Sequence, residues 1–144
     1  MTAEKYLIVA AEDNEADVFL IREALEHRKL ACDLAVFDNG EAVVEFIDTL
    51  DRGEARVPDV ILLDLNMPRK SGDEVMRHLR RSARCSSVPV VVVTSSDSPK
   101  DRDRAAKLGV SAYFHKPVEL DKFLELGGLV KDLLEGRPVT QTQG

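Results

Sequence analysis

The chain of 144 residues contains no tryptophan, only two cysteines and no long apolar run. Cys32 and Cys85 lack Cys-x-x-Cys spacing, and two isolated cysteines are typical of free thiols in an intracellular protein. No apolar run approaches the roughly 18 residues that a membrane span requires. The short apolar run Leu7–Ala11 meets Glu12 and Asp13, so it does not have the form of a signal peptide. These absences predict a cytoplasmic protein without a membrane segment.

Basic residues are also in the minority. The chain has 20 Lys and Arg against 26 Asp and Glu, a formal net charge of -6. A nucleic-acid-binding protein usually carries a basic patch or stripe, so we expect no nucleic-acid partner. A hydrophobic fraction of 44% and a length of 144 residues fit one globular domain. We expect a domain over residues 1–135, a short polar tail over 136–144 and no output domain.

Short apolar runs alternate along the chain with amphipathic segments. The predicted strands are Tyr6–Val9, Leu34–Phe37, Val60–Leu63, Val90–Val93 and Ala112–Phe114. The predicted helices, in which apolar residues recur every three or four positions, are Glu15–Arg28, Glu41–Leu50, Asp73–Arg81, Lys100–Leu108 and Glu119–Leu134. This alternation predicts a doubly wound α/β fold with a five-stranded parallel sheet of flavodoxin-like order 2-1-3-4-5.

Polar side chains directly follow four of the predicted strands. Glu12 and Asp13 follow the first strand, Asp64 the third, Thr94 the fourth, and Lys116 the fifth. The carboxyl ends of parallel strands lie along one edge of a sheet, where ligands bind, so these side chains should converge. An isolated aspartate at a strand end is more often a helix cap or a turn residue. Together, the five suit a metal ion and a phosphoryl group.

Three neighbouring carboxylates raise one another's pKa unless a cation neutralises them. Mg²⁺ prefers carboxylate, carbonyl and water oxygens. Glu12, Asp13 and Asp64 could supply side-chain oxygens, and Asn66 could supply its backbone carbonyl. Asp64 ends the central strand and is the best-placed nucleophile, since a carboxylate that attacks phosphorus gives an aspartyl phosphate. The threonine and the lysine at neighbouring strand ends would then contact the phosphoryl oxygens.

This arrangement closely resembles the receiver domain of two-component response regulators, over residues 6 to about 134. The resemblance implies that Asp64 is the phosphoacceptor, Thr94 the switch hydroxyl, and Lys116 the lysine that contacts the phosphoryl group. It places Tyr113 where receivers have an aromatic side chain that changes rotamer on phosphorylation. The acidic pair and the loop after the phosphoacceptor match the family as well.

The fragment Glu12–Asp17 is most similar to stand-alone receivers that work with bacteriophytochromes. The resemblance implies a sensor histidine kinase, including the bacteriophytochrome type, or a histidine phosphotransfer protein as phosphodonor, and Mg²⁺ as cofactor. It implies a readout through altered partner binding or through self-association as a homodimer. It implies no enzyme activity beyond the phosphorylation and dephosphorylation of the domain itself, and a cis Lys116–Pro117 peptide bond.

Two other functions stay open. A small aspartyl-phosphate phosphotransferase of the haloacid-dehalogenase type would carry a second aspartate two residues after the nucleophile, where this chain has Asn66. A pseudo-receiver that binds partners without being phosphorylated has usually lost an acidic residue or the lysine, and this chain retains them. Asn66 and Ser96 occupy the positions through which receivers set their dephosphorylation rate, so the lifetime of the phosphoryl group also stays open.

Two features of the predicted helices allow more than one interpretation. The consecutive apolar residues Val18 to Ile21 fit either a deeply buried first helix or a contact surface for the phosphodonor. Gly127 and Gly128 lie inside the last predicted helix, where each glycine costs about 1 kcal/mol relative to alanine. Close approach of another helix, for example across a dimer, would explain them, and so would a local kink.

Overall fold

The strands form one parallel sheet in the predicted order. The computed structural model describes residues 5–138, and its five strands have the order β2-β1-β3-β4-β5. Residues 139–144 of the predicted tail lie outside the described residues. The strands are β1 Tyr6–Ala11, β2 Cys32–Phe37, β3 Val60–Leu63, β4 Val90–Thr94 and β5 Ala112–His115. The helices are α1 Glu15–His27, α2 Gly40–Asp51, α3 Gly72–Arg81, α4 Pro99–Lys107, α5 Leu120–Phe123 and α6 Glu125–Leu134.

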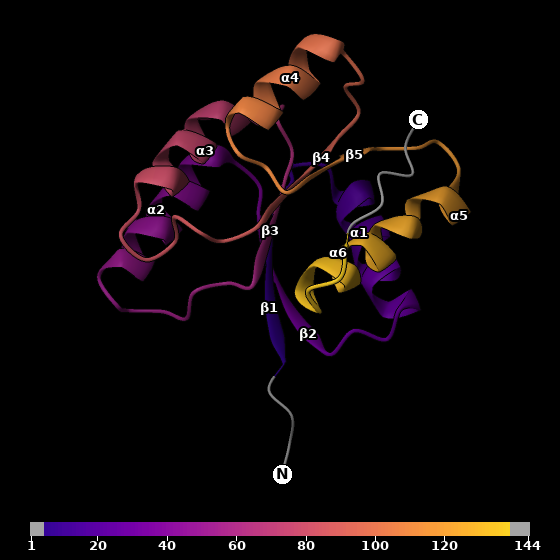
Figure 1. The fold of residues 1–144 in the computed structure, drawn as a ribbon, viewed down its shortest axis with the longest axis horizontal. Helices are drawn as coiled ribbons and strands as arrows, with labels where there is room; N and C mark the ends of the chain where they lie inside the picture. The colour runs from indigo at the N-terminus through magenta and orange to yellow at the C-terminus, as the bar shows by residue number, and fades with distance from the viewer. Residues whose placement is uncertain (1–4, 139–144) are drawn as a thin grey trace.

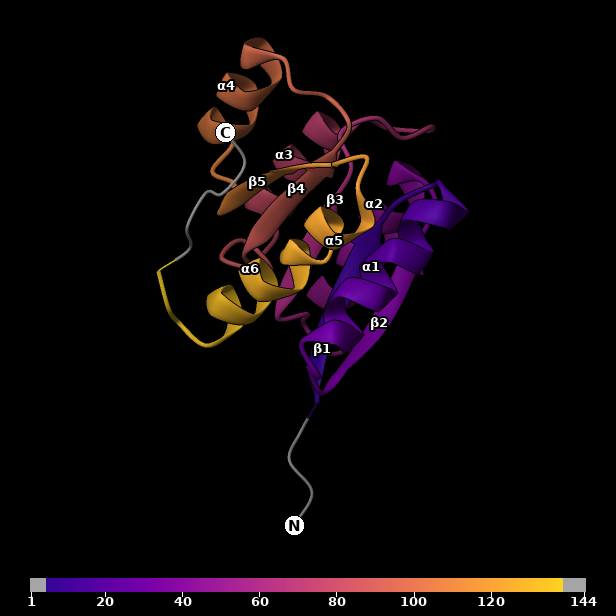
Figure 2. The ribbon, with the colours of Figure 1, turned by 90° about the vertical axis from the view of Figure 1, so that its right-hand side faces the viewer.

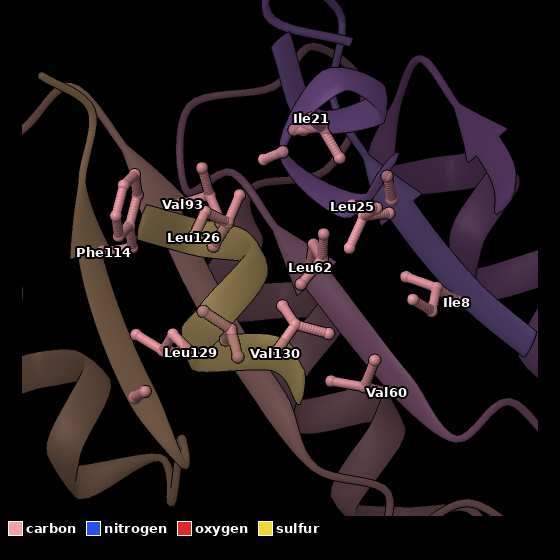
Figure 3. Close-up of a cluster of buried hydrophobic side chains, with 14 of the residues drawn as sticks. Ile8, Ile21, Leu25, Val60, Leu62, Val93, Phe114, Leu126, Leu129 and Val130 are labelled. Atoms are coloured by element: carbon pink, nitrogen blue, oxygen red, sulfur yellow. The ribbon is translucent and has the colours of Figure 1, made fainter. Parts of the chain in front are cut away.

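Helices cover both faces of the sheet (Figure 1): α2 and α3 lie on one side, and α1, α5 and α6 lie on the other. Each face has its own apolar core because successive strand residues point to opposite sides. Ile8 and Ala10 of β1 belong to the core under α1 and α6, shown in Figure 3, whereas Val9 and Ala11 belong to the core under α2 and α3. The sheet is therefore a buried, rigid platform for the groups at its carboxyl edge.

Polar caps begin four of the helices. The side chains of Asn14, Asn39, Ser71 and Ser98 accept hydrogen bonds from backbone N–H groups in the first turns of α1, α2, α3 and α4. Such caps satisfy N–H groups that have no partner within the helix. Because each cap follows a strand or its loop, it fixes where the chain turns away from the sheet edge.

The last predicted helix, Glu119–Leu134, is divided in the structure. Helix α5 ends at Phe123 and α6 begins at Glu125, with Leu124 between them. The N–H of Gly127 donates to the carbonyl of Leu124, three residues back, at 3.1 Å. This tighter turn lies where the segment meets α1, which runs beside α6 in Figure 2. The prediction of a single helix is therefore wrong at Leu124, where the segment is interrupted.

Gly127 is required by the contact between α1 and α6. A Cβ atom at this position would lie 2.0 Å from the carbonyl oxygen of Ala24 in α1. The two helix backbones therefore approach too closely for any side chain. The neighbouring helix belongs to the same chain, so the glycine pair does not require a dimer.

The apolar run of α1 is buried at some residues and exposed at others. Ile21 is buried in the core, whereas the side chain of Phe19 is 60% exposed. The run is therefore buried only in part, because adjacent residues of a helix face different directions, and its role as a contact surface for the phosphodonor stays a prediction. Within residues 5–138, none of the helices combines the length and the apolar character that crossing a membrane requires.

Candidate functional site

The predicted residues converge at the carboxyl edge of the sheet. Glu12 and Asp13 follow β1, Asp64 follows β3, Thr94 ends β4, and Lys116 follows β5. Carboxylate oxygens of Glu12, Asp13 and Asp64 lie within 4.8 Å of one another. Three carboxylates this close are an oxygen donor set that suits a hard divalent cation.

Lys116 forms ion pairs with three carboxylates. Its Nζ lies 2.7 Å from Oε1 of Glu12, 2.8 Å from Oδ2 of Asp17 and 3.0 Å from Oδ2 of Asp64. A lysine ammonium has three N–H donors, so each can face one carboxylate. The lysine thus joins the acidic pair after β1, the first turn of α1 and the end of β3.

Burial makes these charges depend on one another. The side chains of Glu12, Asp64 and Lys116 are 2%, 8% and 10% exposed. Burial raises the pKa of Glu12 to about 7, against the opposing effect of the Lys116 charge. Burial also disfavours the Lys116 ammonium, but its hydrogen bond with Asp17, its close ion pair with Glu12 and the charge of Asp64 outweigh this and raise its pKa above the usual range. Lys116 is therefore a firmly charged cation beside the Asp64 carboxylate.

The loop after β3 folds back over Asp64. The backbone N–H of Asn66 donates to Oδ1 of Asp64 at 3.0 Å. Gly72 makes this turn possible, because a Cβ there would lie 2.8 Å from the Cα of Leu65. One Asp64 oxygen thus faces this loop and the other faces Lys116. The role of the Asn66 carbonyl as a metal ligand stays a prediction.

Ser96 connects the two predicted switch residues. Its N–H donates to Oγ1 of the fully buried Thr94 at 3.3 Å, and its carbonyl accepts from the Tyr113 hydroxyl at 2.9 Å. The Ser96 hydroxyl donates to the carboxylate of Asp101 in α4. The guanidinium of Arg102 lies 4.5 Å from the centre of the Tyr113 ring, within the range of a cation–π contact. Ser96 therefore contacts Thr94, Tyr113 and helix α4.

The backbone after β5 differs from the expectation of a cis bond. The peptide bonds between described residues are all trans, Lys116–Pro117 included. The isomers of an X-Pro bond differ by only about 0.5–1 kcal/mol, so the dipeptide alone does not determine the isomer. The N–H of Lys116 donates to the carbonyl of Thr94 at 2.7 Å, which holds the lysine at the sheet edge.

Asp17 is a site residue that the sequence analysis did not identify. It lies in the first turn of α1 and not at a strand end, so it does not belong to the strand-end pattern that the other site residues share. The one available indication was Asn14, three residues earlier. Asn14 caps α1 by accepting a hydrogen bond from the N–H of Asp17 at 3.1 Å, which fixes the first turn of the helix beside the acidic pair.

Known proteins share this fold and this site. The family model for the response regulator receiver domain matches residues 8–126. The response regulator Rcp1 of Synechocystis sp. is 32% identical over 131 residues, which cover 90% of this chain and 89% of Rcp1. The Mn²⁺-bound structure of Rcp1 matches with a TM-score of 0.80 and 29% identity, over 94% of this chain and 99% of that chain.

Two further solved structures are close relatives in shape. The phosphorylated cyanobacterial phytochrome response regulator RcpA has a TM-score of 0.84 and 28% identity, over 96% of this chain and 100% of that chain. The bacteriophytochrome response regulator AtBRR has a TM-score of 0.72 and 31% identity, over 99% of this chain and 100% of that chain. The family match covers most of the chain, and the acidic cluster and the lysine lie where its strands end. The chain belongs to the response regulator receiver domain family.

Proposed function

We propose that this protein is a phosphorylation switch that accepts a phosphoryl group on Asp64 from a histidine side chain of a sensor kinase or a phosphotransfer protein. The observation that carries the proposal is the position of the Asp64 carboxylate. It lies 3.0 Å from the Lys116 ammonium and within 4.8 Å of the carboxylate oxygens of Glu12 and Asp13. A nucleophile beside a fixed cation and a metal-binding donor set is what phosphoryl transfer requires.

Mg²⁺ is the cofactor that we propose for this site, with Glu12, Asp13, Asp64 and the backbone carbonyl of Asn66 as ligands. When bound, Mg²⁺ lowers the charge barrier between an anionic nucleophile and a phosphoryl group. The Mn²⁺-bound form of the relative Rcp1 supports a divalent cation here.

The transfer itself exchanges one bond to phosphorus for another. An oxygen of Asp64 forms the new O–P bond, the N–P bond of phosphohistidine breaks, and its electron pair remains on the imidazole nitrogen, which takes up a proton. Lys116 balances the charge on a phosphoryl oxygen, and the Thr94 hydroxyl donates a hydrogen bond to another. The only chemistry in this proposal is the protein's own phosphorylation and dephosphorylation.

The signal would leave the site through the β4–α4 loop. If the Thr94 hydroxyl turns to the phosphoryl group, it leaves its present contact with the Ser96 N–H. Ser96 also accepts from the hydroxyl of Tyr113, so a shift of this loop frees the tyrosine to change rotamer. The added negative charge then alters partner binding or self-association.

A phosphodonor of the phytochrome type is the proposed partner. RcpA and AtBRR are named as phytochrome and bacteriophytochrome response regulators, and both match almost the whole chain. The exposed Phe19 of α1 lies close in sequence to the acidic pair and offers an apolar contact to a docking kinase.

Intact mass after incubation with acetyl phosphate and Mg²⁺ tests the proposal. The wild type should gain one phosphoryl group, and Asp64→Asn should gain none, because an amide lacks the nucleophilic carboxylate. Omitting Mg²⁺, or adding EDTA, should prevent the gain in the wild type.

The result also distinguishes a receiver from a pseudo-receiver. A wild type that gains no phosphoryl group, and binds no beryllofluoride, would be a pseudo-receiver. An adduct that persists in Asp64→Asn would place the acceptor elsewhere.

A further inference from the structure

The four carboxylates of the site form two overlapping sets, one suited to a divalent cation and one around the Lys116 ammonium. Glu12, Asp13 and Asp64 make up the metal-binding cluster, whereas Glu12, Asp17 and Asp64 surround the Lys116 ammonium. Two of the carboxylates thus serve both sets. Asp13 belongs only to the cluster, and Asp17 belongs only to the lysine.

Hydrogen bonds fix the backbone of Asp17 next to Glu12. Its N–H donates to the side chain of Asn14 at 3.1 Å, and the N–H of Asn14 donates to Oε2 of Glu12 at 3.2 Å. The side chain of Asp17 is 22% exposed, against 10% for the lysine that it contacts. A single capped turn therefore presents Glu12 and Asp17 to the same ammonium from fixed positions.

Because Glu12 and Asp64 belong to both sets, a bound divalent cation would also affect Lys116. A divalent cation in the cluster draws on the charge of Glu12 and Asp64 and repels the nearby ammonium. Asp17 is then the one carboxylate partner of Lys116 that the cation does not share. Without Asp17, the ammonium would depend on Glu12 and Asp64 alone and would compete with the cation for both.

We propose that Asp17 is a positioning residue that holds the Lys116 ammonium in the site while the divalent cation occupies the acidic cluster. This inference rests on the proposed function, in which the cluster binds Mg²⁺ and the lysine contacts the phosphoryl group. It makes the first turn of α1, next to the proposed docking surface, a part of the phosphorylation site.

Calorimetric titration with Mg²⁺ tests the role of Asp17 in the charge balance. Asp17→Asn should weaken Mg²⁺ binding by about tenfold, because the lysine competes more strongly for Glu12 and Asp64 and one negative charge is lost. Glu15→Gln is the control: it removes the same charge from the same helical turn, at an exposed residue that is not among the ion-pair partners of Lys116 within residues 5–138. It should weaken binding by about threefold or less. Equal losses in the two variants would overturn the proposal.

The NMR signal of the Lys116 side-chain ammonium gives a second readout that needs no phosphoryl donor. In the Mg²⁺-loaded wild type, the ammonium protons should exchange slowly with water, since Asp17 still holds them. They should exchange faster in Mg²⁺-loaded Asp17→Asn, and Asp17→Glu should restore slow exchange in part. Fast exchange in the loaded wild type would overturn the proposal even if the variants do not fold. A wild type that meets these expectations but gains no phosphoryl group would refute the proposed function alone.

Discussion

At the scale of single residues, one half-buried guanidinium shows how a charge joins segments outside the site. Arg80, near the end of α3, donates to the carbonyls of Ser86, Val88 and Gly109 at 2.9, 3.2 and 2.9 Å. Burial lowers the pKa of Arg80, and backbone oxygens compensate it in place of a carboxylate. These bonds tie α3 to the chain before β4, which ends at Thr94, and to the turn before β5, which Lys116 follows.

Arg80→Lys should therefore lower the free energy of unfolding by about 2 kcal/mol, because an ammonium cannot reach carbonyls on both segments and leaves some without a donor. Urea denaturation measures this change. Arg81→Lys is the control, since Arg81 is the exposed neighbour on the same helix turn and should change stability by less than about 0.5 kcal/mol. Equal effects in both variants would contradict the role assigned to Arg80.

The thiols give a second prediction at this scale. Cys85 is fully buried and Cys32 is half-buried, and burial raises the pKa of both thiols. Because the thiolate is the reactive form, Cys32 should react slowly with a disulfide reagent at pH 8 in the folded protein, and the fully buried Cys85 should hardly react at all. We expect one slowly reacting thiol, Cys32, under native conditions and two after unfolding in urea. A rapidly reacting Cys85 in the native protein would show that its part of the core opens readily.

At the scale of elements, the contact between α1 and α6 depends on a single missing side chain. The two glycines of α6 have opposite surroundings although they are adjacent. A Cβ on Gly127 would meet backbone of α1, whereas a Cβ on Gly128 would meet the end of the Arg28 side chain, at 2.8 Å. Backbone cannot move without shifting a whole helix, but a long side chain can change rotamer.

Substituting each glycine by alanine should accordingly have opposite effects. Gly127→Ala should destabilise the protein by about 1–3 kcal/mol through overpacking, after the gain in helix propensity is included. Gly128→Ala should be neutral or stabilising by up to about 1 kcal/mol, because it keeps the gain and displaces only Arg28. Thermal and urea unfolding of the two variants provide the measurement. A Gly127→Ala protein as stable as the wild type would mean that the helices are not held this close in solution.

At the scale of the whole molecule, stability is linked to the occupancy of the acidic edge. The chain carries a formal net charge of -6, and three of its carboxylates lie within 4.8 Å of one another. Asp13 has no cationic side chain as a partner among residues 5–138, so its charge opposes the compact state at low salt. In the proposed function a divalent cation would remove this repulsion, and it would stabilise the folded state because it binds that state selectively.

Mg²⁺ should therefore raise the midpoint of thermal unfolding. The free energy of unfolding should increase by about 1.4 kcal/mol for each tenfold excess of Mg²⁺ over its dissociation constant. Asp13→Asn should be more stable than the wild type without Mg²⁺, by about 1 kcal/mol at low salt, and should lose most of the Mg²⁺ effect. Scanning calorimetry with Mg²⁺ or EDTA distinguishes these outcomes. A midpoint that Mg²⁺ leaves unchanged in the wild type would argue against a metal site in this cluster.

The sequence by itself determined the parts of this protein that rest on local pattern. Alternating apolar and amphipathic segments predicted all five strands, and the parallel sheet they imply placed Glu12, Asp13, Asp64, Thr94 and Lys116 at one edge. The reason is that strand ends in a parallel sheet share an edge whatever the loops do. The predicted strands were too short by up to two residues: β1 extends two residues further at its end, and β2 begins two residues earlier. Apolar character alone does not show where the pairing of two strands begins or ends.

Only the tertiary structure decided the features that depend on distant segments. Asp17 reaches Lys116 across 99 residues of sequence, and no periodicity within α1 distinguishes it from other acidic residues on that helix. The glycine pair of α6 could be interpreted only from its contact with α1, since Gly127 meets the backbone of Ala24 and Gly128 meets the Arg28 side chain. Sequence patterns report which face of an element is buried, whereas the partner that meets that face is fixed by how the whole chain packs.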